Sequence, residues 1–276
     1  MAEASKFFSL LTQTSTVRET RDPRLARGYP ASEGFRWLSA GWRDLWTNPV
    51  PSIIYGLGVL VLSAAFVWTL FAFGRDYILF PALAGFMIIA PFLALGLYEK
   101  SRALEEGRRV TFGQMILARA RAGAQVFYAG LLLCLLMLLW MRAAVLIYAL
   151  FFGVTAFPGL DHIAQMLFGT LYGWIMLIVG TAIGGIFAAF AFSISVFSMP
   201  MMLERRVDAL TAMGESTRLV WNNLPALIGW GAMVLALFII SVLTGLLGMV
   251  IIFPLLGHAT WHAYRAIALP RRDEGA

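Results

Sequence analysis

The sequence has 276 residues, of which 60% are hydrophobic and only 13% are charged, and its mean hydropathy is +0.79. A soluble domain carries about 25% charged residues, so water cannot be the solvent for most of this surface. The formal charge of +6 does not indicate a nucleic-acid-binding protein, because the Lys and Arg residues flank apolar segments, as orientation signals do. The only cysteine, Cys134, excludes an internal disulfide and a zinc site built on clustered cysteines.

The N-terminal region divides into a tail and an amphipathic segment. Residues 1–34 are polar with spaced arginines, which predicts a flexible basic cytoplasmic tail. From about residue 35 to 47, apolar residues recur at helical spacing while charged residues face away. Trp and Arg together on a short helix are typical of the membrane interface, so we expect an amphipathic interfacial helix here. The apolar residues of this helix are Phe35, Leu38, Trp42, Leu45 and Trp46.

Six apolar segments follow, and about 20 apolar residues suffice to cross the hydrocarbon layer. They predict an all-α polytopic membrane domain over residues 35–268. The segments pair into three hairpins, at about 52–98, 126–203 and 224–264, and a short cytoplasmic tail, 269–276, ends the chain. The polar amphipathic stretch before the third hairpin predicts a second interfacial helix.

The apolar run from about residue 166 to 203 is too long for one untilted crossing at about 1.5 Å per residue. Four glycines in this run are spaced so that they share one helix face, which favours close helix contact. We therefore expect one long, tilted or kinked helix; an interfacial helix followed by a separate span is the alternative. The four glycines, each expected to contact another helix, are Gly169, Gly173, Gly180 and Gly184.

The basic residues are distributed unevenly along the chain. Of the 21 Lys and Arg residues, only Arg75 and Arg142 lie outside the N-terminal tail, the two polar segments between hairpins and the C-terminal end. Because basic residues accumulate on the cytoplasmic side, both termini are expected in the cytoplasm. Residues 75–76, 153–162 and 244–248 are then expected on the outer side.

The first and last hairpins match each other in sequence. Residues 43–62 match residues 218–237 without a gap, and Pro91 matches Pro254 in the helix that follows. This predicts a parallel internal repeat about an axis near the membrane normal. The matched pairs include Trp46 with Trp221, Asn48 with Asn223 and Arg102 with Arg265.

Three stretches, Gly41–Leu45, Ala94–Glu99 with Ser101–Arg102, and Phe253–Arg265, resemble a family of bacterial integral membrane proteins, DUF2189, a domain of unknown function. The resemblance extends over about residues 35–268. It implies a multi-pass protein of the bacterial inner membrane, and it implies no established activity.

The candidate functional residues are two histidines and one arginine. His258 and His262 stand four residues apart on one helix face, where they could share a metal ion or offer a haem ligand. The alternative, which we favour, is that they form hydrogen bonds across helices or to headgroups. Arg142 lies inside the third span, and we expect it to snorkel or to pair with Asp161, with a substrate or lipid role as the alternative.

Three functional classes remain, and no enzymatic one is among them, because phosphate loops, nucleophile motifs and metalloprotease motifs are absent from the sequence. The first is a non-enzymatic structural, assembly or accessory partner of a larger membrane complex. The second is a small-solute transporter, which internal repeats favour. The third is a haem- or metal-binding membrane protein that uses His258 and His262. We expect membrane lipids as partners, no cofactor and no nucleic acid.

Overall fold

The computed structural model describes residues 25–153 and 159–269, and these residues form helices and turns with no strand. The predicted all-α class is therefore confirmed. Most of the predicted N-terminal and C-terminal tails lies outside the described residues. The helical elements are α2 (Glu33–Trp46), α3 (Pro49–Ala72), η1 (Asp76–Ile78), α4 (Leu79–Leu93), α5 (Leu95–Glu105), α6 (Phe112–Ile116), α7 (Gln125–Phe152), α8 (Leu160–Phe168), α9 (Leu171–Ser195), α10 (Ser198–Glu204), α11 (Ala209–Asn222), α12 (Leu224–Leu243) and α13 (Met249–Ala268).

Within the described part of the chain, five helical segments are long and apolar enough to cross a membrane. The predicted sixth span, α13, is not among them, because its second half carries polar residues such as His258, His262 and Arg265. The count of six spans is therefore not confirmed. The five segments are Pro49–Ala72, Asp76–Glu105, Gln125–Phe152, Leu171–Glu204 and Leu224–Leu243.

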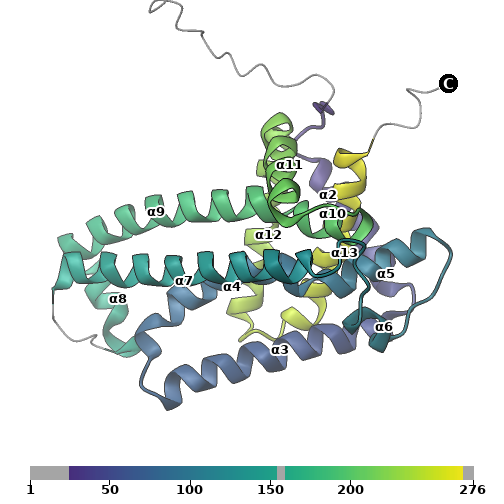
Figure 1. Ribbon diagram of the computed structural model, residues 1–276. Coiled ribbons are helices and arrows are strands. Elements are labelled where there is room, and N and C mark those ends of the chain that lie inside the picture. The colour runs from purple at the N-terminus through teal and green to yellow at the C-terminus, as the bar shows by residue number, and fades with distance from the viewer. Residues whose placement is uncertain (1–24, 154–158, 270–276) are drawn as a thin grey trace, which may run out of the picture.

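The long helices α3, α7 and α9 extend toward the same end of the molecule, on the left of Figure 1. α4 packs antiparallel to α7: a Cβ at Gly130 would touch the ring of Phe92, and the indole N–H of Trp140 donates to the carbonyl of Pro81 at 2.9 Å. The same indole ring packs against Phe187 of α9, with ring centroids 5.6 Å apart. These contacts make α4, α7 and α9 one packed unit.

The run from residue 166 to 203 is divided among α8, α9 and α10, so the preferred prediction of one long, tilted or kinked helix is wrong. The alternative, a short helix followed by a separate span, agrees with α8 and α9. α8 ends at Phe168, and Thr170 has extended backbone angles (φ −126°, ψ 147°). The Thr170 side chain accepts a hydrogen bond from the Gly173 amide at 3.0 Å, which is how an N-cap begins a new helix. A second break separates α9 from α10 after Ser195.

The glycine face predicted for this run is wrong as a single packing surface. A Cβ at Gly184 would meet Trp140 of α7 at 2.9 Å, and one at Gly173 would meet the backbone of α8. A Cβ at Gly180, however, would have no neighbour within 4 Å, and one at Gly169 would meet only its own helix end, at Gln165. The break at Thr170 explains the position of Gly169, since it removes this residue from the face of α9.

The last hairpin, formed by α12 and α13, does not extend as far along α3 as the first hairpin does. A Cβ at Gly56, early in α3, would collide with the carbonyl of Val250 and lie 2.9 Å from Pro254. The start of α13 therefore lies beside the first half of α3, while α3 continues to Ala72. In Figure 1 the turn between α12 and α13 does not reach the end formed by α7, α8 and α9.

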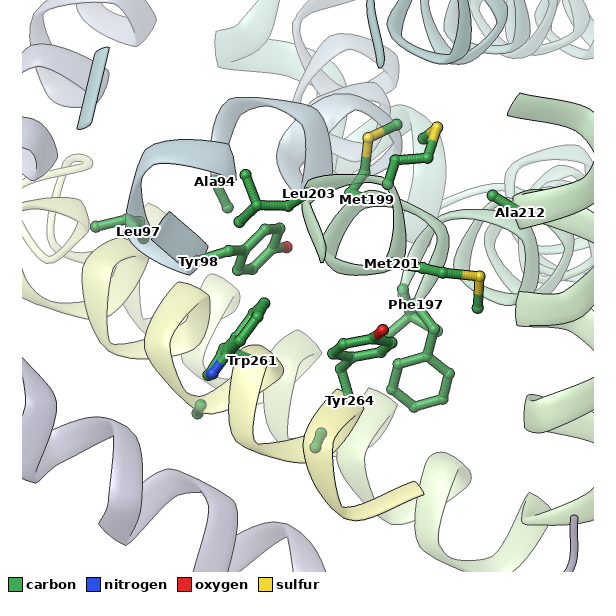
Figure 2. Close-up of a cluster of buried hydrophobic side chains, with 14 of the residues drawn as sticks. Ala94, Leu97, Tyr98, Phe197, Met199, Met201, Leu203, Ala212, Trp261 and Tyr264 are labelled. Atoms are coloured by element: carbon green, nitrogen blue, oxygen red, sulfur yellow. The ribbon is translucent and has the colours of Figure 1, made fainter. Parts of the chain in front are cut away.

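The core lies at the opposite end, where α5, α10, α11 and α13 meet (Figure 2). Trp261 and Tyr264 of α13 are fully buried there, with ring centroids 5.6 Å apart. Tyr98 of α5 and Phe197, just before α10, are buried against them. Burial of such aromatic side chains supplies much of a helical core's hydrophobic stabilisation.

Both predicted interfacial helices form, as α2 and α11. α2 buries Trp37, Gly41 and Leu45, while Phe35 and Trp42 on its other face are 65% and 45% exposed. This leaves an aromatic face uncovered by the protein, beside Arg36 and Arg43. Their position relative to a membrane surface stays a prediction.

Candidate functional site

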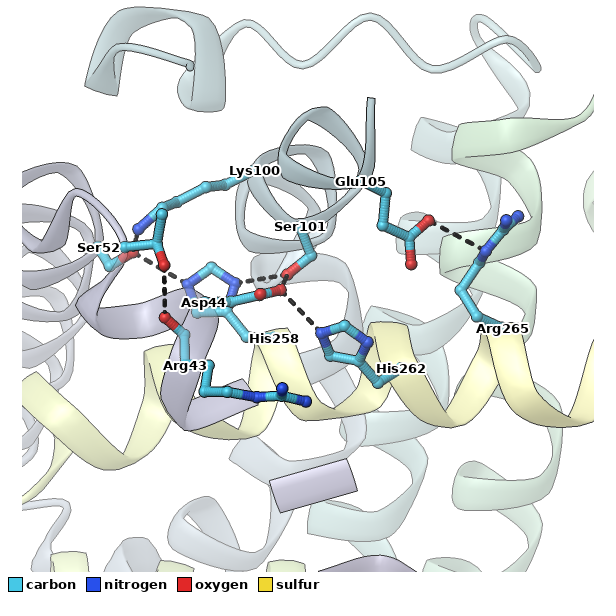
Figure 3. A network of polar contacts seen from close by, with 10 residues as sticks. Arg43, Asp44, Ser52, Lys100, Ser101, Glu105, His258, His262 and Arg265 are labelled. Atoms are coloured by element: carbon cyan, nitrogen blue, oxygen red, sulfur yellow. Dashed lines mark hydrogen bonds and ion pairs between the residues drawn. The ribbon is translucent and has the colours of Figure 1, made fainter. Parts of the chain in front are cut away.

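His258 and His262 lie on the face of α13 that packs against α2, α3 and α5, as Figure 3 shows. Two glycines let the helices approach closely here. A Cβ at Gly41 of α2 would lie 2.6 Å from the backbone nitrogen of Ala259, and one at Gly257 would lie 2.6 Å from the side chain of Leu97 of α5. These approaches bring polar side chains of four helices to one buried place.

His258 is completely buried, and both of its ring nitrogens have a hydroxyl partner. Its Nε2 lies 2.9 Å from the Oγ of Ser52 on α3, and its Nδ1 lies 2.8 Å from the Oγ of Ser101 on α5. Both serines are also fully buried. The prediction that this histidine forms hydrogen bonds across helices agrees with this geometry.

Lys100 is the next group in the chain of contacts, and it is 1% exposed. Its ammonium donates to the Oγ of Ser52 at 2.7 Å and to the carbonyl of Asn48 at 2.8 Å. Asn48 joins α2 to α3 in the left-handed region (φ 57°), which Asn tolerates better than most residues. A buried ammonium without such acceptors would be costly.

Asp44 of α2 lies at the other end of this chain of hydrogen bonds, opposite Lys100. The hydroxyl of Ser101 donates to Asp44 Oδ2 at 2.6 Å, and His262 Nε2 lies 2.8 Å from the same oxygen. Burial alone would raise the pKa of this carboxyl, but the hydrogen bonds from His262 and Ser101 outweigh it and hold the pKa below its ordinary value of 3.8. Asp44 is therefore a carboxylate at neutral pH.

A second group of ion pairs adjoins the first along α13. Arg265 pairs with Glu105 of α5 at 3.1 Å and with Glu204 of α10 at 2.7 Å, and Glu204 also accepts from the hydroxyl of Tyr264 at 2.6 Å. Arg265 thus connects three helices. Glu105 thus pairs across helices, whereas Glu99 pairs within α5, with Arg102 at 2.6 Å.

The remaining candidates lie away from this site. Arg142 is exposed on α7; the side chain of its predicted partner Asp161 lies outside the described part. His162 is exposed on α8, at the end of the molecule remote from α5 (Figure 1), so it cannot join the two histidines of α13. Over residues 25–153 and 159–269 no group of three or more His, Cys, Asp or Glu residues is arranged to hold a metal ion.

The three hydrogen-bond partners of the histidines, and Lys100 beside them, were not predicted from the sequence. Asp44 and Ser52 precede His258 by about two hundred residues, and Lys100 and Ser101 lie in a stretch that reads as an ordinary charged helix end. A signal was nevertheless present. The three stretches that carry the family resemblance contain Asp44, Ser101 and both histidines, and the structure brings these stretches into contact.

The comparisons with known proteins support the membrane class. The family model DUF2189, described as a predicted integral membrane protein, matches residues 79–204. The matched part runs from α4 to α10 and includes Lys100 and Ser101, but neither α2 nor α13. The comparisons with curated proteins and with solved structures gave no match. Residues 79–204 are thus similar to a family of predicted integral membrane proteins, and the five long apolar helices agree with this class.

Proposed function

We propose that this integral membrane protein is a non-enzymatic structural or assembly partner of a larger complex in the bacterial inner membrane. The protein's polar groups and its apolar surfaces support this role in different ways. The buried polar groups around His258 and Lys100 are engaged with one another. The apolar surface of the long helices is, by contrast, largely uncovered by the chain itself.

The orientation that belongs to this proposal has both termini in the cytoplasm. The distribution of Lys and Arg supports it. A contact between the two ends of the described chain supports it as well: the guanidinium of Arg27 donates to the carbonyls of Ile267 and Leu269 at 3.2 and 3.0 Å. Such a contact is expected if the segments before α2 and after α13 lie on the same side of the membrane, as an even number of crossings requires.

The observation that carries the proposal is the outward face of α9. In the most apolar part of the segment Leu171–Glu204 only 6% of residues are buried, and a Cβ at Gly180 or Gly185 would have no neighbour within 4 Å. Small residues on an apolar face let another membrane helix approach closely. We propose that this face receives a helix of a partner protein.

Photo-crosslinking in native membranes tests this role. A crosslinking side chain at Ile178 or Ile186, which are 67% and 70% exposed on α9, should yield an adduct with a protein of one defined mass. The same group at Val61 of α3, which is 60% exposed, should yield lipid adducts only. The α9 adduct should disappear with Gly185→Leu and persist with Gly58→Leu, a matched change at an open glycine of α3. Lipid adducts alone at all three positions would reject the proposal.

The geometry supports the other two classes less. Metal or haem ligation by His258 would require breaking its hydrogen bond to Ser52 or to Ser101, because both ring nitrogens are engaged. A small-solute transporter remains the second candidate. The buried chain of ionisable groups around Lys100 favours it, since such groups inside membrane proteins often serve transport or proton transfer.

A further inference from the structure

A chain of hydrogen bonds links Lys100 to Asp44 through Ser52, His258 and Ser101. The donor and the acceptor of each bond can be assigned by starting from the two charged ends. At the Asp44 end, a carboxylate only accepts, so the single proton of the Ser101 hydroxyl is used on Asp44. Ser101 Oγ then has only lone pairs left for His258. His258 must therefore carry its proton on Nδ1 and donate it to Ser101 across 2.8 Å.

The Lys100 end is compatible with the same assignment. An ammonium only donates, so Ser52 Oγ accepts from Lys100 at 2.7 Å. The proton of Ser52 is then available for His258 Nε2 at 2.9 Å. In a neutral imidazole with its proton on Nδ1, Nε2 accepts this proton, so that each of the four groups is used.

We propose that this chain is a proton relay between the buried Lys100 and the aqueous phase at Asp44. In the transfer step Lys100 gives a proton to Ser52, Ser52 gives its own proton to Nε2 of His258, Nδ1 gives its proton to Ser101, and Ser101 gives its own to Asp44. The products are a neutral amine, the other neutral tautomer of His258 and a carboxylic acid. No proton is lost or gained, and the reverse sequence restores the starting state.

The solvent exposure of the side chains supports a buried end of the relay at Lys100 and a water-accessible end at Asp44. Lys100, Ser52, Ser101 and His258 are at most 1% exposed, so water does not reach them directly. The side chains of Asp44 and His262 are 16% and 22% exposed, so the relay opens to water there. The other charged pair on this side, Glu105 with Arg265 on α13, is joined by its own hydrogen-bonding contact and takes no part in the chain.

The sequence offers an unusually clean test, because Lys6 and Lys100 are its two lysines. In a Lys6→Arg background, ¹⁵N-lysine labelling reports on Lys100 alone, and ¹⁵N-histidine labelling reports on the tautomer of His258. We expect the Nδ1–H tautomer at neutral pH. We also expect Ser101→Ala to slow exchange of the Lys100 protons with water about tenfold, the factor that one lost hydrogen bond gives.

Two matched variants separate the relay from general loss of structure. Ser101→Thr keeps the hydroxyl and should restore exchange. Thr47→Ala removes a nearby hydroxyl that bonds only within its own helix turn, to the carbonyl of Arg43, and should leave exchange unchanged. An Nε2–H tautomer or an imidazolium at His258, or unchanged Lys100 exchange in a folded Ser101→Ala protein, would overturn the relay.

Discussion

The first and last hairpins begin alike and then diverge. α2 and α11 each have 14 residues, and each exposes a tryptophan near its end, Trp46 and Trp221, both 50% exposed. α3 then runs for 24 residues and α12 for 20. The turn after α3 contains Arg75 and Asp76, whereas the turn after α12 contains no charged residue.

The alignment of the predicted repeat shows how the two hairpins differ at the polar site around His258. In its alignment, Asp44 and Ser52 of the first hairpin correspond to Leu219 and Leu227 of the last, which are buried at 6% and 1% exposure. His258 is in the last hairpin, and its partners are in the first. The two hairpins are thus complementary rather than equivalent: one is apolar where the other is polar. The repeat itself stays a prediction, and the changes below test this complementarity.

The largest effect is expected where the hairpins approach most closely. Gly56→Leu places a side chain against the backbone of Val250, and such overpacking should cost about 3 kcal/mol or more of unfolding free energy. Gly58→Leu is the control, because a Cβ there meets nothing within 4 Å. Folded yield and thermal stability in detergent measure both. Equal tolerance of the two changes would contradict the packing of α3 on α13.

The second expected difference concerns the two outer turns. In a Cys134→Ser background, Arg75→Cys should react with a membrane-impermeant maleimide added to spheroplasts. Leu247→Cys should not react, although Leu247 is 68% exposed in the protein. The reason is depth: the start of α13 lies beside Gly56 in the first half of α3, so the turn before α13 is expected to lie farther from the outer surface than the turn after α3. Equal labelling rates would instead place both turns at the outer surface, as the sequence predicts.

A smaller effect separates two glycines of the α7–α9 unit, which lies between the hairpins in the chain. Gly184→Leu should destabilise the protein by about 1–2 kcal/mol, because the new side chain meets Trp140. Gly180→Leu should be tolerated in the purified protein, because its face is open. Thermal unfolding of the two variants decides this. A loss at Gly180 as large as that at Gly184 would mean that α9 packs differently.

The smallest effect is a pH dependence at Asp44. Its pKa is held below 3.8 in the folded protein, so its contribution to stability is present above the unfolded-state value and is lost as pH falls through the folded value. The stability difference between the wild type and Asp44→Asn should therefore be constant above about pH 5 and shrink below about pH 4. Melting curves of both proteins across this window measure it. A difference that grows on acidification would contradict the assignment.

The sequence predicted the fold better than the site, for a physical reason. Long apolar runs bounded by polar residues define helices locally, so the third predicted hairpin begins at residue 224, where α12 begins. The break at Thr170 was missed because its N-cap lies within an uninterrupted apolar run. The partners of His258 were missed because pairing across about two hundred residues leaves no local pattern. Only the convergence of the three family-like stretches pointed to them.

The most direct test of the account is a double-mutant cycle between the ends of the buried chain. Lys100→Met or Asp44→Asn alone should each cost about 3 kcal/mol, because each leaves a buried partner without its counterpart. The double variant should cost less than the sum, with a coupling energy of about 2 kcal/mol. Unfolding in detergent measures all four proteins. Additive losses, with coupling below about 0.5 kcal/mol, would contradict the claim that one connected polar chain joins the two hairpins.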